Sequence, residues 1–322
     1  MEKTVDSNQK KTKSKVVSYA KWGYIFILPF FAIYLIFTLY PQITTIIYSF
    51  FDYYELGLDT YGPEFVGFKN YVDLFTLNSN GQMVILNCLW NTIIMWVMGA
   101  VVQLLLSLLL ALFFTSTRLN IKGAGFFKSV FYMPNLIMAS AFAFLFFAVF
   151  NTVGPVNQIL SAMGIIGDVA EEGIDFIGTY PWSTRSLVAF MNFLMWFGNT
   201  TILLMAGIMG IDESLFESAR VDGASSTRVF FDITLPLLKP ILVYVLITSM
   251  IGGLQMFDVP QVLSAGTGNP NKSTKTLVML LNENLKGNSN YGVSGAIAVV
   301  LFIITAVLSI LVFKSITKKD DR

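Results

Sequence analysis

The side chains that most often perform enzyme chemistry are scarce in this sequence of 322 residues. It contains no histidine and a single cysteine, Cys88, which excludes Ser-His-Asp triads, Cys-His pairs, His-metal sites and intrachain disulfides. No G-x-x-x-x-G-K-[ST] phosphate loop occurs; the nearest segment, Gly266 to Ser273, has Asn271 where the second glycine is required. We expect that segment to be an ordinary polar loop. The sequence therefore predicts no catalytic residue, no metal site and no cofactor.

A charged segment beginning near Asp212 interrupts an otherwise apolar sequence. Asp212 is a suitable N-cap, and Glu213 and Glu217 favour the positive N-terminal half of a helix. Gly223 would end that helix in the left-handed conformation after about three turns. Three residues are expected to share one face of it: Leu215, Phe216 and Ala219.

A second short helix is expected to follow this glycine. Ser225 or Ser226 would cap its N-terminus, and it would end at Pro236. The two helices with a glycine elbow would form a compact projection, for example a docking handle. An ordinary amphipathic loop lying against a membrane fits these residues equally well.

The composition indicates the environment in which these segments lie. Hydrophobic residues make up 55% of the chain and the mean hydropathy is +0.66, far above soluble proteins. A helix needs about 20 apolar residues to cross roughly 30 Å of hydrocarbon. Six stretches of about that length lack charged residues, and they predict an all-α integral membrane protein with six transmembrane helices. They lie at approximately 22–40, 89–114, 130–150, 187–210, 241–257 and 293–313.

Basic residues orient these spans, because Lys and Arg near span ends are retained on the cytoplasmic side. Placing both termini in the cytoplasm leaves only five of the 21 basic residues outside: Lys69, Arg185, Lys272, Lys275 and Lys286. The predicted organisation is then a cytoplasmic basic tail at 1–21, a membrane domain at 22–313 with a cytoplasmic loop at 212–240, and a cytoplasmic tail at 314–322. No small-residue cleavage pattern follows the basic tail, so we expect a retained anchor.

The charge pattern also excludes whole classes of function. A net charge of +1 gives no indication of nucleic-acid binding. No formal charge is expected near the middle of any span, which disfavours a proton- or sodium-coupled carrier, although sodium sites built from carbonyls and hydroxyls escape this argument. A membrane-embedded enzyme is disfavoured as well, because no cluster of catalytic polar groups is evident.

The cytoplasmic loop resembles the signature of permease subunits of binding-protein-dependent ABC importers. That signature reads Glu-Ala-Ala, three residues, Gly, nine residues, Ile-x-Leu-Pro. Six residues match it at the same spacing, and Ser218 replaces the middle alanine: Glu217, Ala219, Gly223, Ile233, Leu235 and Pro236. Four further segments resemble carbohydrate permeases related to maltose permeases: Phe65 to Tyr71, Asp222 to Ser225, Thr234 to Leu238, and Tyr291-Gly292.

The resemblance implies an ABC type I importer permease architecture in a bacterial cytoplasmic membrane. The expected partners are a second homologous permease, cytoplasmic ATP-binding subunits that hydrolyse ATP, an extracytoplasmic solute-binding protein, membrane lipid and a sugar, with an oligosaccharide favoured. In this reading the loop 212–240 docks on an ATPase subunit. The residues expected to couple are Glu217, Ser218, Ala219, Asp222, Gly223, Ile233, Leu235 and Pro236.

A sugar path within the spans needs hydrogen-bonding groups and flat aromatic faces. The resemblance places four substrate-path positions on the fourth span and four on the fifth: Asn192, Met195, Trp196 and Asn199, then Ser249, Gly252, Gly253 and Met256. Asn192 and Asn199 are seven residues apart and share one helix face. The small residues of the fifth span fit close helix packing as well as a cavity. A permease for a non-sugar solute would share the cytoplasmic loop and stays an alternative.

Overall fold

The computed structural model describes residues 20–77, 83–116, 121–287 and 289–317. The predicted N-terminal tail therefore lies almost wholly outside the described residues, as does most of the C-terminal tail. The chain divides into two compact units, Met1–Ile46 and Ile47–Arg322, and we describe each by itself.

The first unit contains one long apolar helix. It runs through α1 (Ala20–Tyr34), the wider π-helical turn η1 (Leu35–Leu39) and into α2 (Tyr40–Tyr48). Its side chains from Trp22 to Phe37 are largely exposed, as expected where lipid contacts a helix. The helix continues to Tyr48, about two turns beyond the predicted end at residue 40, because Pro41 lies in the first turn of α2 and does not break it.

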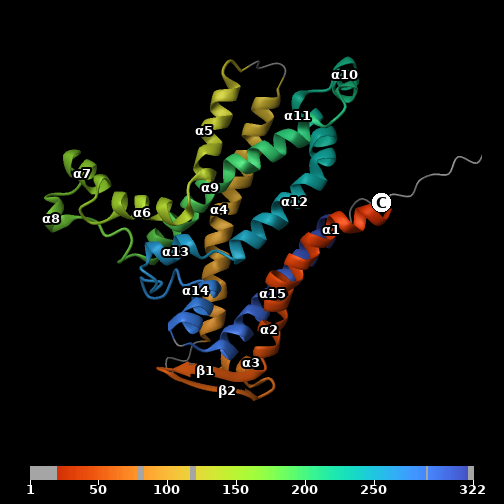
Figure 1. Ribbon diagram of the computed structural model, residues 1–322. Coiled ribbons are helices and arrows are strands. Elements are labelled where there is room, and N and C mark those ends of the chain that lie inside the picture. Colours follow the sequence, from red (N-terminus) through yellow and green to blue (C-terminus); the bar gives the residue numbers. More distant parts are fainter. Residues whose placement is uncertain (1–19, 78–82, 117–120, 288, 318–322) are drawn as a thin grey trace, which may run out of the picture. The chain divides into compact units, whose positions relative to one another are not determined.

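The described residues contain six helical segments long and apolar enough to cross a membrane, which confirms the predicted architecture. They are Trp22–Tyr48, Val84–Thr115, Ala139–Ala162, Pro181–Met209, Ser226–Leu263 and Tyr291–Ile316. In the second unit the principal helices are α4 (Val84–Thr115), α5 (Ala124–Leu136), α6 (Ala139–Phe150), α9 (Pro181–Met209), α12 (Leu235–Leu254) and α15 (Tyr291–Thr317). Figure 1 shows α4, α5 and α9 running side by side toward the short helix α10 (Glu213–Val221).

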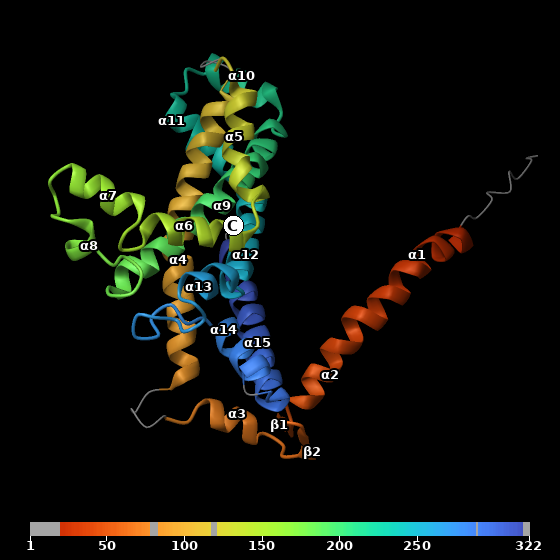
Figure 2. The ribbon, with the colours of Figure 1, turned by 60° about the vertical axis from the view of Figure 1, so that its left-hand side comes forward.

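Shorter elements connect these spans. They are α3 (Lys69–Leu74), α7 (Pro155–Ala162), α8 (Val169–Glu172), α11 (Ser226–Val229), α13 (Asp258–Leu263) and α14 (Leu277–Asn282), with the π-helical turns η2 (Phe230–Thr234) and η3 (Glu283–Gly287). Helices α7 and α8 lie away from the long helices, next to α6 (Figure 2).

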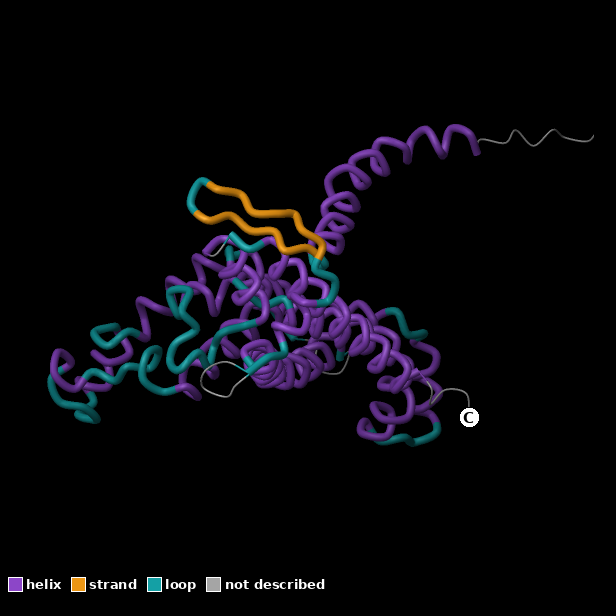
Figure 3. The backbone as a smooth tube through the Cα atoms, turned by 90° about the horizontal axis from the view of Figure 1, so that it is seen from below, coloured by secondary structure: helices purple, strands orange, loops and turns teal. Residues whose placement is uncertain are grey.

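A β-hairpin is an element that the sequence reading did not foresee. Strands β1 (Phe51–Leu56) and β2 (Asp59–Phe65) pair antiparallel across a two-residue turn in which Gly57 has a φ of +67°. Aromatic pairs stabilise it, with the rings of Tyr54 and Tyr61 stacked at 5.2 Å. The hairpin is the one β-sheet among the described residues (Figure 3). It lies at the end of the second unit opposite α10.

The prediction of one continuous helix from 130 to 150 was wrong. The chain forms α5 and α6 instead, with Ile137 and Met138 extended between them. Pro134 lies in the last turn of α5 and cannot donate a backbone hydrogen bond. The Asn135 side chain donates to the carbonyl oxygen of Met195 at 3.0 Å, which ties the break to α9.

The prediction that a second short helix ends at Pro236 was also wrong. Helical structure is continuous from α11 through η2 into α12. In η2 the Leu235 N–H donates to the carbonyl of Phe230, five residues back, so the wider turn comes directly before Pro236. Pro236 therefore lies in the first turn of α12, where a missing N–H is tolerated.

Helix α9 forms the centre of the second unit. More than half of its most apolar window is buried, a larger share than in any other described span. Small residues allow its neighbours to approach closely. A Cβ placed on Gly198 would lie 2.0 Å from the carbonyl oxygen of Phe131 on α5, and one on Gly99 of α4 would lie 2.7 Å from the carbonyl oxygen of Ala189. The bundle is thus fixed around α9 by backbone contacts that side chains would prevent.

Candidate functional site

The predicted first helix of the charged segment is confirmed as α10. The Asp212 carboxylate accepts a hydrogen bond from the backbone N–H of Ser214 at 3.0 Å, which caps the helix. The same bond holds the pKa of the Asp212 carboxyl below its ordinary value. At the other end Gly223 has a φ of +73°, and the Ala224 N–H donates to the Ala219 carbonyl at 2.9 Å. This is the left-handed helix end that the glycine predicts.

The chain turns at this point into the next helix. The Ser225 hydroxyl accepts a hydrogen bond from the Arg228 N–H at 3.3 Å, so Ser225 is the N-cap of α11. Arg228 also pairs with Asp232 one turn later, at 3.4 Å. We call the segment from Asp212 to Ser225 the α10 elbow.

The two faces of the α10 elbow differ. Ala219 is buried and Phe216 is half-buried beside a cavity of about 560 Å³ that the ends of α4 and α9 help to line. Leu215 is exposed, so only two of the three residues expected to share a covered face do so.

The outward face of the α10 elbow contains Val221, which is 88% exposed, and four exposed coupling candidates, namely Glu217, Ser218, Asp222 and Gly223. Ile233 and Leu235 are half-buried, and Pro236 is exposed.

A second cavity, of about 230 Å³, lies within the spans. Seven of the eight predicted path residues line it: Asn192, Trp196, Asn199, Ser249, Gly252, Gly253 and Met256. Met195 does not. Its side chain is buried in the hydrophobic cluster that includes Val188 and Met191. We call this space the span cavity.

The span cavity also has a wall that the sequence reading missed. Helix α4 contributes four residues at helical spacing, namely Trp96, Gly99, Ala100 and Gln103. The Gln103 side chain donates to the Thr200 hydroxyl of α9 at 2.8 Å, and the Trp96 N–H donates to the Ser249 hydroxyl of α12 at 3.3 Å. The signal was available in the sequence, since an amide in the middle of an apolar span is costly and usually functional.

The two glycines of α12 have different roles. A Cβ on Gly253 would lie 2.1 Å from the Trp96 ring, so Gly253 provides close packing between α12 and α4. A Cβ on Gly252 would meet no atom within 4 Å, so Gly252 faces open space in the span cavity. The sequence left open whether these glycines serve close helix packing or a cavity. Gly253 serves close packing, and Gly252 lines the span cavity.

Two of the segments that carried the carbohydrate resemblance, Phe65 to Tyr71 and Tyr291-Gly292, hold the β-hairpin in place. Asn70 is buried and its side-chain amide donates to the carbonyls of Ser49 and Phe51, at 3.0 and 2.9 Å. The Tyr71 hydroxyl lies 2.6 Å from the Ser49 hydroxyl. Gly292 at the start of α15 allows the Phe51 carbonyl to approach, since a Cβ there would lie 2.2 Å from its oxygen. Both segments therefore meet at β1.

Residues 103–318 match the family of binding-protein-dependent transport system inner membrane components. The chain belongs to this family. The match covers about two thirds of the chain and includes the α10 elbow and the α9 and α12 walls of the span cavity, with Gln103 of the α4 wall. Membership establishes that the chain is a permease and a multi-pass protein of the bacterial cytoplasmic membrane. Transport systems of this family work with a binding protein.

Curated relatives align over nearly the whole length. The chain is 30% identical to a lactose transport system permease protein of Rhizobium radiobacter, over 90% of this chain and 92% of that protein. It is 30% identical to a multiple sugar-binding transport system permease protein of Streptococcus mutans, over 93% and 96%. A bacterial ABC transporter that imports the acidic polysaccharide alginate has a chain of the same fold, with a TM-score of 0.74 at 21% identity over 92% and 96%.

Proposed function

We propose that this chain is the permease subunit of an ATP-driven importer that moves a neutral sugar, with an oligosaccharide as the favoured substrate. The observation that supports a sugar as the substrate is the lining of the span cavity. It combines two tryptophan rings with amide and hydroxyl groups, and no charged residue is among the described residues that line it. A neutral carbohydrate presents hydroxyls and C–H patches that match such a surface.

The lack of charged side chains among the described residues of this lining distinguishes neutral from anionic substrates. Several relatives are named for sugars, but one is an sn-glycerol-3-phosphate permease of Agrobacterium fabrum and the structural neighbour belongs to an alginate importer. An anionic solute would lose its hydration in the span cavity without gaining a positive partner there. The neutral sugar is therefore favoured over an anionic solute.

The span cavity alone is smaller than typical ligand pockets of about 300–1,000 Å³. Its tryptophan Trp196 is 47% exposed, and Asn199 is half-buried. A second homologous permease would supply the opposing wall of a complete path, in line with the resemblance.

The α10 elbow is proposed to be the contact for a cytoplasmic ATP-binding subunit. Supporting this, its outward face carries the exposed apolar side chain Val221 among polar residues, and Phe216 and Ala219 anchor it on the bundle. Both chain termini would then lie in the cytoplasm and the β-hairpin on the extracytoplasmic side, where the binding protein delivers the sugar. Closure of the ATPase pair would shift the spans between two arrangements.

Uptake by a strain lacking the chromosomal copy of this gene tests the substrate class. The panel contains labelled neutral oligosaccharides, oligosaccharides of uronic acids and glycerol phosphate, each offered with wild-type chain, Trp196→Ala or Trp182→Ala. We expect uptake of a neutral oligosaccharide that Trp196→Ala lowers at least tenfold. Trp182 is an exposed tryptophan outside the span cavity, so Trp182→Ala should leave uptake unchanged. Uptake confined to the anionic solutes would contradict the proposal.

A further inference from the structure

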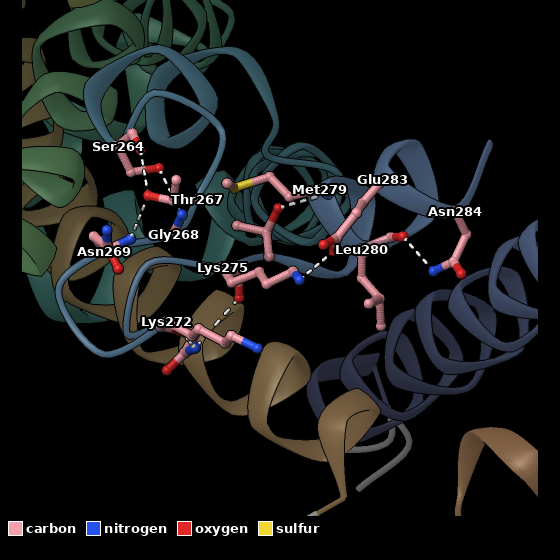
Figure 4. Close-up of polar contacts among 12 residues, drawn as sticks. Ser264, Thr267, Gly268, Asn269, Lys272, Lys275, Met279, Leu280, Glu283 and Asn284 are labelled. Carbon is pink, nitrogen blue, oxygen red and sulfur yellow. Dashed lines mark hydrogen bonds and ion pairs between the residues drawn. The ribbon is translucent and has the colours of Figure 1, made fainter. Parts of the chain in front are cut away.

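The segment from Ser264 to Thr276 is not the ordinary polar loop that its composition predicts. Ser273, Thr274, Lys275 and Thr276 are all buried. The Asn91 side chain on α4 donates to the carbonyls of Lys272 and Lys275, at 2.8 and 3.3 Å. Figure 4 shows Lys272 and Lys275 beside α4, with the Lys275 ammonium group pointing to Glu283. The loop is thus folded onto the end of α4 that lies opposite the α10 elbow.

A cavity of about 650 Å³ lies between this loop and the first turns of α4 and α9. We call it the basic cavity, because three cationic residues line it: Arg185, Lys272 and Lys275. None of the described residues that line it is acidic. Glu283 neutralises Lys275, so two positive charges remain. Both long helices also present their N-termini here, at Val84 and Pro181, and helix N-termini favour anions.

One buried polar group in the basic cavity has no hydrogen-bond partner in the part of the chain that the structure describes. The Ser273 side-chain hydroxyl makes no hydrogen bond among the described residues, and Ser273 is only 6% exposed. Its own carbonyl accepts a hydrogen bond from Arg185 Nε at 3.0 Å, while Arg185 Nη2 donates to Asn91 Oδ1 at 2.7 Å. The guanidinium is therefore fixed beside an unsatisfied donor. A buried hydroxyl without a partner is unfavourable unless a ligand completes it.

The position of the basic cavity indicates which anion reaches it. Trp90 lines it and is 62% exposed, and the Arg185 guanidinium lies 5.0 Å from the ring centre of Trp182, which is 61% exposed. Exposed tryptophans near span ends lie at the level of lipid headgroups. Helix α4 has 32 residues and a length of about 48 Å, which exceeds the roughly 30 Å hydrocarbon core. Its first two turns, with Trp90 and Asn91, then lie within the headgroup layer.

We propose that the basic cavity binds the phosphate group of an anionic phospholipid from the surrounding bilayer. Lys272 attracts the phosphate, the fixed Arg185 guanidinium faces it, and the Ser273 hydroxyl donates to it. This role is separate from the span cavity and from the α10 elbow, since the basic cavity shares no lining residue with either.

Thermal unfolding of the full-length chain in detergent tests the proposal, with phosphatidylglycerol, phosphatidylethanolamine of the same acyl chains, or inorganic phosphate added. We expect phosphatidylglycerol to raise the Tm more than the other two. Lys272→Gln should weaken phosphatidylglycerol binding about fivefold, the effect of one basic residue at an anionic lipid surface. Lys286→Gln removes an exposed lysine outside the basic cavity and should bind as wild type does.

Ser273→Ala provides a second test that does not depend on charge. Without lipid it should leave the Tm unchanged or raise it, because it removes a buried group with no partner. With phosphatidylglycerol it should reduce the lipid-dependent rise in Tm. Equal stabilisation by phosphatidylethanolamine, an equal effect of inorganic phosphate, or unchanged lipid binding in both Lys272→Gln and Ser273→Ala would each overturn the proposal.

Discussion

Single polar side chains connect elements that are distant in the sequence. Gln103 joins α4 to α9 through Thr200, and the Ser107 hydroxyl donates to the Phe197 carbonyl at 2.8 Å, also between α4 and α9. Asn70 joins α3 to β1. Each of these donors is buried, so losing it leaves an acceptor that water cannot easily reach.

Asn70→Ala should loosen the β-hairpin. The change removes the donor for the carbonyls of Ser49 and Phe51, and we expect a local loss of about 2 kcal/mol. Amide hydrogen exchange should then speed up roughly thirtyfold across residues 51–65. Lys69→Ala changes the exposed neighbour and should leave exchange unchanged. Equal exchange in the two variants would contradict the role of Asn70.

The neighbouring glycines of α12 should respond oppositely to the same substitution. Gly253→Ala places a methyl group against the Trp96 ring and should lower stability by about 1–3 kcal/mol, measured by thermal unfolding. Gly252→Ala meets open space and should leave stability unchanged. The larger Gly252→Leu should keep the fold but block uptake, because it extends into the span cavity. Normal uptake with Gly252→Leu would argue against this path.

At the scale of elements, prolines show what a sequence pattern leaves undetermined. Pro134 coincides with the break between α5 and α6, whereas Pro29 and Pro240 lie inside continuous helices. The difference at Pro134 is tertiary: Asn135 bonds to the Met195 carbonyl, 60 residues away along the chain. Similarly, Pro236 does not end its helix because the η2 turn precedes it. These outcomes depend on partners that local sequence does not contain.

The packing of α5 on α9 gives a prediction at this scale. Gly198→Ala should separate the two helices, because its methyl group would meet the Phe131 backbone carbonyl, which cannot rotate away. We expect a fall of about 1–3 kcal/mol in stability by thermal unfolding. Gly207→Ala on the same helix would meet only the side-chain tips of Ile241 and Leu238, which can move. It should therefore be close to neutral, and equal effects of the two changes would contradict the packing argument.

For the whole molecule, the sequence predicted what local composition and spacing determine. The six spans follow from apolar stretches, and the α10 elbow follows from Asp212, Gly223 and Ser225, all of which behave as expected. Seven of the residues predicted for a sugar path line the span cavity, and their role in the path stays a prediction. The α4 wall was not predicted: the amide of Gln103 within an apolar span was a signal, but its partner Thr200 lies 97 positions away along the chain. The buried loop at Lys275 was missed for the same reason.

The central claim is that an ATPase drives this permease through the α10 elbow, and Gly223→Pro tests it most directly. Proline fixes φ near −65° where Gly223 has +73°, and it removes the N–H that donates to the Arg220 carbonyl at 3.1 Å. Gly223→Asn is the matched control, since asparagine tolerates the left-handed conformation and no atom lies within 4 Å of its Cβ position.

The measurement is ATP-dependent uptake of labelled oligosaccharide into vesicles that contain the assembled importer, together with recovery of the ATPase subunit on the purified permease. We predict that Gly223→Pro inserts into the membrane but loses both uptake and the ATPase subunit, whereas Gly223→Asn retains most of each. Normal ATP-dependent uptake by Gly223→Pro, or wild-type uptake that continues without ATP, would contradict the account.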